Sequence, residues 1–463
     1  MSRLRPFLGP RSVAILGAGE RATSSGGAVL RNLQRAGFTG RITPVNPKGG
    51  TILGLAAARS LKEIAEPAEL AVIAVRPDLI PALVEEAAAS GHKHLLILPG
   101  GFREAGGEGR RREAEVKRIA DKAGITIAGP NSAGVIHLDP SAPFAATFLR
   151  DLPPGGGIAF LTQSGAMAEE VIAVANERNL PVRTIVSVGN GLHLGVDDFL
   201  EHLGADPACK TVLLYIESVE DEARFRKIAR SVAADKPVVA LIGGWTGAGA
   251  EAVQNHTGSH AFSEAAAERF CRECGMIRVK SFRRLLLAAK GFGFHPQGMG
   301  RRVFLLSNSG GPGVVTSDRV IEEGLTLPPL PQGMADHLAG ALPAEAAIAN
   351  PIDLLADARE ERFGVSMEAA REHGAFDALL MIHVVPFMVD ADPVIERIAR
   401  LAPKMGLPVM HSMMGTLPKK REWFARLEAA GVAMFNDAEE MAEAAGIVAR
   451  YPAIQDALRS TNS

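Results

Sequence analysis

Residues 12–19 read SVAILGAG, and this stretch decides the fold because the same opening returns twice. Residues 157–167 read GIAFLTQSGAM, and residues 302–314 read RVFLLSNSGGPGV. Each is a short apolar run rich in β-forming residues, followed by a Gly/Ser turn and then by a helical pattern. This succession is typical of the first strand of an open parallel sheet. The sequence therefore predicts three such sheets.

Further short apolar runs follow each opening at α/β spacing, with alanine-rich helical stretches between them. Strands that are buried on both faces and alternate with helices predict parallel sheets wrapped by helices. Pro/Gly-rich segments at 149–157 and 293–302 mark the predicted boundaries. The chain is therefore expected to be an α/β protein with three doubly wound parallel-sheet domains, over residues 1–150, 151–298 and 299–463.

The composition argues against several classes of function. Lys and Arg number 50 against 52 Asp and Glu, a formal charge of -2, which is too balanced for the basic face that nucleic acid or an anionic membrane requires. No run approaches the roughly 18 apolar residues of a membrane span, and the first residues lack the apolar core of a signal peptide. Three cysteines cannot form a disulfide framework in a chain of this size. The sequence therefore predicts a soluble, cytoplasmic protein.

Cys271 and Cys274 have the spacing of a redox motif. They lie within AAAERFCRECGM, which is a helical pattern. This context favours two ordinary helical thiols, with a redox pair as the alternative.

The first glycine turn, residues 17–27, opens a helix whose free N–H groups can hold a phosphate. In such sheets ligands bind beyond the carboxyl ends of the strands, so the turn residues carry the functional information. The second strand ends in Asn-Pro-Lys at 46–48, where an NAD-binding protein would place an acidic residue for the ribose. Lys48 suits a phosphate-rich ligand instead, and an exposed lysine without a function is the alternative.

The second and third turns open helices as well. Ser164 is predicted to cap the helix that Gly165 begins, and Gly310, Gly311 and Gly313 bare the backbone amides of the third turn. Taken singly, either turn is more often plain strand-to-helix geometry. Together they form a candidate site for a phosphoryl group, because helix N-termini favour negative charge.

His256 lies in AVQNHTGSHAF (252–262), a stretch without apolar periodicity that predicts a loop or a helix end. Glu217 ends an apolar strand, where ligands collect. Its carboxylate could accept the imidazole N–H and make the other ring nitrogen more nucleophilic, and a solvated strand-end glutamate is the alternative. With the glycine turns, these residues predict a phosphohistidine. His260 stands four residues from His256, but no third ligand is evident and no metal is expected.

The ordered motifs resemble those of the α subunit of NDP-forming acyl-CoA synthetases, the ADP-forming acetate–CoA ligase family, which is related to succinyl-CoA synthetase. The resemblance runs from residue 10 to residue 354. Its motifs are PRSVAILGA (10–18), ITPVNPK (42–48), LAVIAVRP (70–77), AGPNSAGVI (128–136), LTQSGAMA (161–168), SVGN (187–190), LYIES (214–218), HTG (256–258), NSGGPGV (308–314) and NPIDL (350–354).

The resemblance implies a Rossmann-like domain that binds CoA, followed by two flavodoxin-like domains. It implies that His256 carries phosphate with the support of Glu217. The helix starts at Ser164-Gly165 and at Gly310, Gly311 and Gly313 would hold that phosphate. The residues assigned to CoA are Gly17, Ser24, Ser25, Gly26, Lys48, Val75, Arg76, Pro77, Gly100, Gly101 and Asn131.

The implied reaction joins a small carboxylic acid to CoA and consumes ATP. It yields acyl-CoA, ADP and phosphate through an acyl phosphate and a phosphohistidine. The three domains use up the chain and leave no room for a nucleotide-binding ATP-grasp region. The resemblance therefore implies a hetero-oligomer in which an ATP-grasp β subunit binds Mg-ATP or Mg-ADP.

Three positions depart from the family's pattern. Trp245 stands in a Gly-Gly-Trp-Thr-Gly segment where the family has an Arg, and Phe262 follows the histidine where small residues are usual. Both bulky side chains are expected to reshape the acyl site. Gly19 replaces a serine near the expected CoA phosphates. A CoA-binding scaffold without catalysis and an NAD-dependent oxidoreductase are the alternative functions.

Glycines surround the histidine segment. They are expected to keep the segment out of a helix, so that it can carry His256 between an acyl phosphate and a nucleotide. The glycines in question are Gly243, Gly244, Gly247, Gly249 and Gly258.

Overall fold

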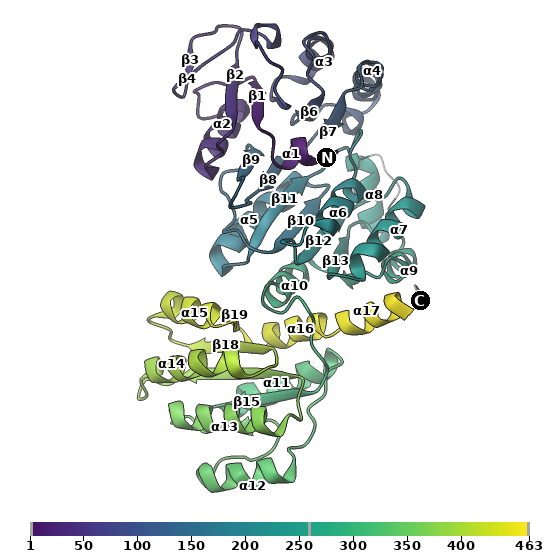
Figure 1. The fold of residues 1–463 in the computed structure, drawn as a ribbon. Coiled ribbons are helices and arrows are strands. Elements are labelled where there is room, and N and C mark those ends of the chain that lie inside the picture. The colour runs from purple at the N-terminus through teal and green to yellow at the C-terminus, as the bar shows by residue number, and fades with distance from the viewer. Residues whose placement is uncertain (1–2, 258–260, 461–463) are drawn as a thin grey trace. The chain divides into compact units, whose positions relative to one another are not determined.

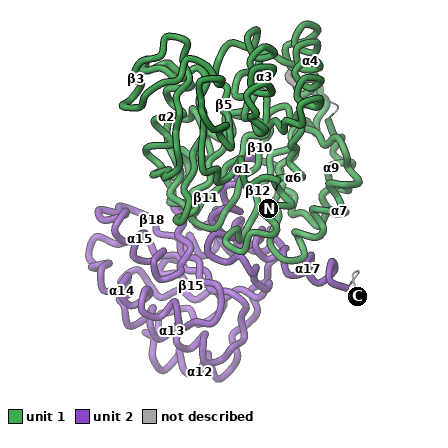
Figure 2. The backbone as a smooth tube through the Cα atoms, turned by 45° about the horizontal axis from the view of Figure 1, so that its top comes forward, with its two compact units in different colours: residues 1–281 green, residues 282–463 purple. Residues whose placement is uncertain are grey.

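The chain forms two compact units, residues 1–281 and 282–463, each built from parallel strands wrapped by helices (Figures 1 and 2). The computed structural model describes residues 3–257 and 261–460, without the side chains at 255–257. The described chain contains two large sheets in the first unit and one in the second. The predicted fold class, an α/β protein with three parallel-sheet domains, is confirmed.

The first sheet has five parallel strands in the order β2-β1-β5-β6-β7. α3 and α4 lie side by side and contribute Val84 and Val116 to the core on one face of this sheet (Figure 1). The elements are α1 (Arg5–Leu8), β1 (Ser12–Leu16), α2 (Ser25–Ala36), β2 (Arg41–Val45), β3 (Thr51–Ile52), β4 (Leu55–Ala56), η1 (Leu61–Glu63), β5 (Leu70–Ile73), η2 (Pro77–Leu79), α3 (Ile80–Ala89), β6 (His94–Ile97), η3 (Arg103–Ala105), α4 (Gly107–Ala123) and β7 (Thr126–Ala128).

The second sheet has seven strands in the order β14-β13-β12-β10-β11-β8-β9. β8 and β9 are antiparallel to their neighbours, and the other strands are parallel. The elements are β8 (Gly134–His137), β9 (Phe144–Thr147), β10 (Ile158–Thr162), α5 (Gly165–Arg178), β11 (Val182–Ser187), α6 (Val196–Ala205), β12 (Thr211–Ile216), α7 (Glu222–Ala233), β13 (Val238–Ile242), α8 (Gly247–Thr257), α9 (Glu264–Cys274) and β14 (Ile277–Val279).

The sheet topology differs from the boundary predicted at residue 150. β8 and β9 lie before that boundary, yet β8 pairs with β11 through Ile136 opposite Ile185. The Pro/Gly-rich segment at 149–157 therefore connects two strands of one sheet. Local composition marks such a connection, but the long-range pairing of β8 decides the domain to which it belongs.

The third sheet lies in the second unit and has five parallel strands in the order β16-β15-β17-β18-β19. Phe363 and Met367 of α13 and Val394 and Ile398 of α14 belong to the core on one face of it. The elements are α10 (Phe282–Phe294), β15 (Val303–Ser307), α11 (Gly310–Glu322), α12 (Gln332–Ala341), β16 (Ile352–Asp353), α13 (Glu360–His373), β17 (Ala378–Val385), α14 (Ala391–Leu401), η4 (Ala402–Lys404), β18 (Val409–Gly415), α15 (Lys420–Ala429), β19 (Ala433–Phe435), α16 (Ala438–Val448) and α17 (Tyr451–Ser460).

The second unit begins at residue 282, before the boundary predicted at residue 298. α10 packs on α16, where a Cβ on Gly291 would lie 2.6 Å from a methyl group of Val448. Arg283 and Arg284 of the same helix form ion pairs with Glu443, at 2.6 Å and 3.1 Å. The helix before the Pro/Gly-rich segment thus belongs to the second unit because its contacts are there.

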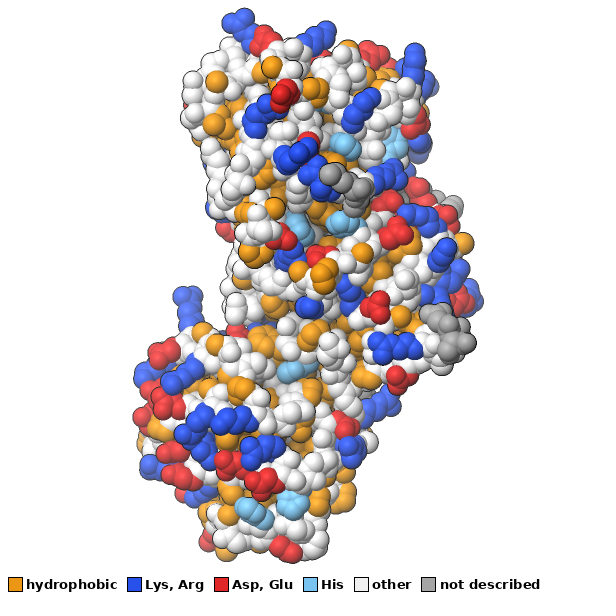
Figure 3. All heavy atoms as spheres, in the orientation of Figure 1, with side chains coloured by type: hydrophobic (Ala, Val, Ile, Leu, Met, Phe, Trp, Pro, Cys, Tyr) orange, Lys and Arg blue, Asp and Glu red, His pale blue; other side chains and the backbone are white. Residues whose placement is uncertain are grey.

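The described surface and thiols agree with the composition. Acidic and basic side chains are interspersed on the face of the molecule seen in Figure 3. Among the described residues, none of the helices has the length and apolar character that crossing a bilayer demands. Cys271 and Cys274 are buried, and burial raises the pKa of each thiol to about 12. They are ordinary buried thiols, as the helical pattern favoured.

Candidate functional site

A cavity of about 780 Å³ lies in the first unit at the carboxyl ends of its strands. Turns that follow β1, β5, β6 and β10 meet there, as parallel α/β sheets predict. The residues that line it are Gly17, Arg21, Thr23, Ser24, Ser25, Ala74, Val75, Arg76, Leu79, Leu98, Pro99, Gly100, Asn131, Ser132, Ala133, Phe148, Gln163, Ser164, Gly165 and Ala166.

Two helix starts border this cavity, and a serine caps each of them. The N–H of Gly27 donates to Ser24 Oγ at 3.1 Å at the start of α2. The N–H of Met167 donates to Ser164 Oγ at 3.4 Å at the start of α5, so the predicted cap is present. Free amides and the positive end of each helix dipole therefore lie beside one cavity, which makes it suited to anionic groups.

Glycines allow α2 to begin close to β1. Gly17 has φ +87°, and a Cβ there would lie 2.4 Å from the carbonyl oxygen of Ala74. A Cβ on Gly26 would lie 2.5 Å from the carbonyl oxygen of Gly17. Gly26 therefore permits close packing of the helix on the turn, while Gly17 is in the cavity wall.

The cavity brings together most of the residues that were assigned to CoA, together with two assigned to phosphate. Four of the residues assigned to CoA do not line it, namely Gly26, Lys48, Pro77 and Gly101. Lys48 is exposed. Pro77 packs against Gly101, where a Cβ would lie 2.8 Å from the proline ring.

Arg21 lines the cavity and was missed from the sequence. It precedes the capping serine by three residues in the glycine turn, a position whose side-chain direction depends on the path of the loop. Arg76 also lines the cavity and forms an ion pair with Asp78 at 2.8 Å. Two guanidinium groups thus add positive charge beside the start of α2.

Asn46 has a structural role at the end of β2. Its side-chain amide donates to the carbonyl oxygen of Ala18 at 2.8 Å, and its Oδ1 accepts the N–H of Lys48 at 3.0 Å. The residue at the position of the NAD ribose ligand therefore ties β2 to the glycine turn. The contacts give the oxidoreductase alternative no support.

Glu217 directly follows β12, and its side chain is buried, with 6% of the residue exposed. The hydroxyl of Tyr215 donates to Glu217 Oε1 at 3.1 Å. Gln163, which lines the cavity, accepts the N–H groups of Glu217 and Ser218 at 2.6 Å and 3.2 Å. A solvated strand-end glutamate is thereby excluded, because this carboxyl group is buried and held by its neighbours.

The segment that leads to α8 passes beside Glu217. The N–H of Gly243 donates to the carbonyl oxygen of Ile216 at 2.9 Å. A Cβ on Gly243 would lie 3.6 Å from Glu217 Cγ. The start of the histidine segment thus lies against the buried carboxyl group.

Residue 256 lies in the last turn of α8, and its side chain is outside the described part of the chain. The predicted helix end is therefore correct for the backbone. The expectation that glycines keep the segment out of a helix is wrong for residues 247–257. Thr246 Oγ1 accepts the N–H of Gly249 at 3.1 Å, and alanines follow, so capping and helix propensity outweigh the glycines.

Trp245 and Phe262 pack against the elements around them. The ring of Trp245 faces the guanidinium of Arg278 at 5.8 Å, and the ring of Phe262 stacks on Phe270 of α9 at 5.0 Å. These contacts engage both aromatic rings with β14 and α9. They give no support to the prediction that the two side chains reshape an acyl site.

The third glycine turn lies in the second unit. Gly310 begins α11, and a Cβ on Gly311 would meet no atom within 4 Å. Asp353, at the end of β16, was not predicted, but one of its carboxylate oxygens lies 3.1 Å from the Cβ position of Gly310. The side chains at 314 and 315 are exposed valines. This helix start is open, but it has a carboxyl group beside it.

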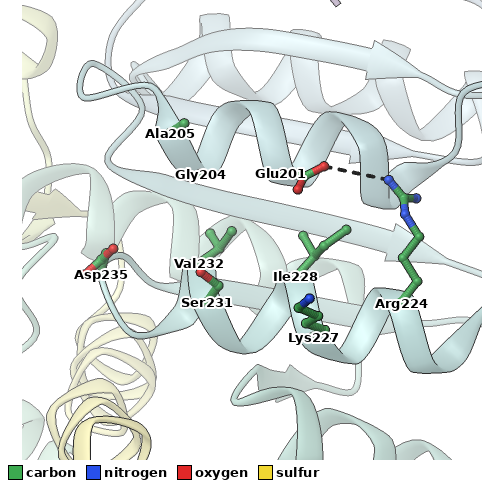
Figure 4. A pocket seen from close by; sticks show the side chains of 9 residues that line it. All are labelled: Glu201, Gly204, Ala205, Arg224, Lys227, Ile228, Ser231, Val232 and Asp235. Atoms are coloured by element: carbon green, nitrogen blue, oxygen red, sulfur yellow. Dashed lines mark ion pairs between the residues drawn. The ribbon is translucent and has the colours of Figure 1, made fainter. Parts of the chain in front are cut away.

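A different hollow, of about 460 Å³, lies between α6 and α7 (Figure 4). Its walls come from the sides of the two helices, and Glu201 faces Arg224 across it at 3.7 Å. Among the described residues, no group of three His, Cys, Asp or Glu side chains has the arrangement of a metal site.

Two family models match the chain. The CoA binding domain matches residues 11–138, and the succinyl-CoA ligase like flavodoxin domain matches residues 155–292. The first covers the α2 side of the cavity, and the second covers the α5 side with Glu217. The cavity thus lies where residues of the two matched domains meet.

Named relatives agree with these matches. The chain is 33% identical to subunit alpha of the ADP-forming acetate–CoA ligase II of Pyrococcus furiosus over 444 residues, which are 95% of this chain and 96% of the relative. It is 36% identical to the ADP-forming acetate–CoA ligase I of Archaeoglobus fulgidus over 379 residues, 81% of this chain and 54% of the relative. The chain thus spans about half the length of the second relative.

A solved structure has the same fold throughout. The dinucleotide forming acetyl-coenzyme A synthetase 1 of Ca. Korarchaeum cryptofilum, in complex with phosphate and ADP, matches with a TM-score of 0.92 and 27% identity over 100% of both chains. The resemblance found in the sequence motifs is confirmed by these similarities. The chain belongs to the family of the ADP-forming acetate–CoA ligases.

Proposed function

We propose that this chain is the α subunit of an NDP-forming acyl-CoA synthetase, an acid–thiol ligase. It would interconvert a carboxylate, CoA and ATP with acyl-CoA, ADP and phosphate. The observation that carries the proposal is the cavity bordered by two capped helix starts, one in each matched domain. A scaffold that only binds CoA has no need for the second helix start or for the buried Glu217 beside it.

The cavity fits CoA at its phosphates and along its chain. The amides at the start of α2, with Ser24 and Ser25, face one end, where Arg21 and Arg76 supply positive charge. We assign the adenine end to Val75. Gly100 and Asn131 line the path toward α5 that the pantetheine arm would take. When bound, CoA supplies the thiol that receives the acyl group.

We assign the phosphoryl relay to His256. Phosphorylated His256 would transfer its phosphoryl group to the substrate carboxylate, so that a phosphorus–nitrogen bond breaks and a phosphorus–oxygen bond forms. The resulting acyl phosphate reacts with thiolate at its carbonyl carbon and releases phosphate. Glu217 would accept the ring N–H of His256 and so increase the nucleophilicity of the other nitrogen when the histidine is rephosphorylated.

Two helix starts would stabilise the transferred phosphoryl group. Ser164 and Gly165 present the amides of α5, and Gly310, Gly311 and Gly313 present those of α11. Preorganised amides of this kind stabilise charge that develops during transfer.

We assign ATP binding, with its Mg²⁺, to an ATP-grasp β subunit in a cytoplasmic hetero-oligomer. The relative from Pyrococcus furiosus is itself named a subunit alpha, and the one from Archaeoglobus fulgidus is about twice as long as the part matched here. The additional length in the longer relative is where the missing nucleotide-binding function would reside. We assign the role of the acyl substrate to a small carboxylic acid.

The reverse half-reaction tests this function on the chain by itself. Radioactive inorganic phosphate and a panel of short aliphatic, hydroxylated and aromatic acyl-CoA thioesters are supplied together. We expect acid-labile label on the wild type and none on His256→Asn, with equal CoA binding in both. CoA binding without label from any thioester would establish the scaffold alternative, and binding of NAD in place of CoA would establish the oxidoreductase.

A further inference from the structure

Tyr215 and Glu217 form a buried pair at the carboxyl end of β12. Residues two apart on a strand lie on the same face, and here the tyrosine hydroxyl donates to Glu217 Oε1 at 3.1 Å. Gly243, at the start of the histidine segment, covers the pair. A Cβ there would lie 2.9 Å from the Tyr215 oxygen and 3.6 Å from Glu217 Cγ. The pair therefore faces the segment that leads to His256.

Gln163 fixes the peptide on which this carboxyl group stands. Its side-chain oxygen accepts the N–H of Glu217 at 2.6 Å and that of Ser218 at 3.2 Å, and its amide donates to the carbonyl oxygen of Ser218 at 3.0 Å. The backbone of Glu217 is thus tied to the residue that precedes the cap of α5. The hydroxyl of Tyr215 holds one oxygen of the Glu217 side chain.

The tyrosine is suited to be a permanent donor. Burial, followed by the charge and hydrogen bond of Glu217, raises the pKa of Tyr215. The hydroxyl therefore keeps its proton at physiological pH. A donor that stays protonated can hold the carboxylate of Glu217 in one direction.

We propose that Tyr215 is a positioning residue for the phosphorylation of His256 and acts through the carboxylate of Glu217. The inference rests on the proposed function. The hydroxyl holds one carboxylate oxygen and so sets the direction in which the carboxylate accepts the imidazole N–H. A carboxylate held in this direction can accept the imidazole N–H and so make the opposite ring nitrogen a better nucleophile.

The test compares the only two tyrosines of the chain. Tyr215→Phe should slow labelling of His256 from radioactive phosphate and acyl-CoA by about tenfold, the effect of losing one hydrogen bond to a charged group. The KM for acyl-CoA should stay within about twofold, so that the loss falls on the rate of labelling and not on the binding of the thioester. CoA binding should stay within about twofold, since Tyr215 does not line the cavity.

Tyr451→Phe is the matched control. Tyr451 is buried in the second unit, and its hydroxyl accepts a hydrogen bond from Gln455 at 3.1 Å. The control loses a buried hydroxyl that lies in the second unit and accepts a hydrogen bond from an amide, so its labelling rate and its KM for acyl-CoA should equal those of the wild type. An equal loss in both tyrosine variants would attribute the effect to general destabilisation and overturn the proposal.

A double-mutant cycle identifies the path of the effect. If Tyr215 acts through Glu217, labelling by the Tyr215→Phe/Glu217→Gln variant should be as fast as by Glu217→Gln alone. If the two losses multiply, or if Tyr215→Phe labels at the wild-type rate, the inference is overturned. Absence of label on the wild type with every thioester would instead contradict the proposed function itself.

Discussion

The starts of α5 and α11 have the same local construction, although they lie in different units. In the first, Thr162 Oγ1 accepts the N–H of Ser164 at 2.9 Å and donates to its carbonyl oxygen at 3.0 Å. In the second, Ser307 Oγ makes the same two bonds with Ser309, at 3.0 Å and 2.8 Å. A hydroxyl at the strand end thus folds each turn so that the next helix begins directly behind it.

The residue after each hydroxyl has a side-chain amide, and this amide ties the turn to a neighbouring strand. Gln163 reaches two residues, Glu217 and Ser218. The side chain of Asn308 is shorter and bonds to one residue, Val384. Asn308 Oδ1 accepts the N–H of Val384 at 2.8 Å, and Asn308 Nδ2 donates to the carbonyl oxygen of Val384 at 2.9 Å. The two turns are therefore versions of one device that presents helix amides.

The two turns differ at one position of the neighbouring strand, two residues after the residue that lies opposite the turn hydroxyl. Thr162 lies opposite Tyr215, and Ser307 lies opposite Ile382, so Glu217 corresponds to Val384. The turn supplies the anion-binding geometry in both units, whereas an acceptor for an imidazole proton is present at this position only beside α5. We infer that α5 combines electrostatic stabilisation with activation of the histidine, and that α11 supplies stabilisation alone.

Exchange of the acidic residue should produce the largest effect. Glu217→Gln keeps the size of the side chain but removes the proton acceptor, so labelling of His256 should fall by about 100-fold. Val384→Ala at the corresponding position of the second unit should change labelling less than about threefold. If the two variants lose similar activity in the same phosphate and acyl-CoA assay, the two positions do not differ in function as inferred.

A negative charge at the start of α11 should separate stability from function. A Cβ at Gly311 would meet no neighbouring atom within 4 Å, so Gly311→Asp has room to begin its side chain, and an acid at a helix start stabilises the helix by roughly 0.5 kcal/mol. The same charge repels a phosphoryl group. We expect an unchanged or slightly raised unfolding midpoint with labelling reduced about tenfold or more. Labelling of His256 at the wild-type rate in Gly311→Asp would show that the start of α11 does not bind the phosphoryl group.

The start of α2 extends the comparison to a third helix, which has arginines nearby in place of a carboxylate. Arg21→Ala should weaken CoA binding about tenfold, because a charged contact to phosphate is lost. Lys48→Ala should weaken it by no more than about twofold, since Lys48 does not line the cavity. Calorimetry of both variants measures the two dissociation constants. The reverse order would restore Lys48 as the main phosphate ligand.

The three strand-turn-helix openings were predictable because strand, glycine turn and helix are adjacent in sequence, and the cavity followed from the convergence of strand ends. The pairing of β8 with β11 was not predictable from composition, because it joins distant residues. Arg21 was missed because its direction depends on the loop path. Tyr215 was hidden in an apolar run, although its alternation with Glu217 placed both on one face of the strand.

The smallest predicted effect is the pH dependence of the stability of the second unit. It arises from His383, at a position where the first unit has an isoleucine. By the same register His383 corresponds to Ile216. His383 is fully buried, packs against Phe363 at 5.1 Å and lies 6.1 Å from the ring of His411. Burial lowers the pKa of His383 from 6.5 to about 4. Between these values the unfolded chain binds a proton that the folded chain does not.

The sign of the pH dependence follows from this difference. The second unit should have its full stability above about pH 6.5 and lose it as the pH falls toward 4, with a loss from His383 of about 1 kcal/mol at pH 6. The chain has two tryptophans, Trp245 in the first unit and Trp423 in the second. In a Trp245→Phe background, Trp423 fluorescence during denaturant unfolding therefore reports the second unit. His383→Ile should reduce the pH dependence and leave the part due to His411, whose pKa burial also lowers. A slope as steep as that of the parent would show that His383 does not contribute to it.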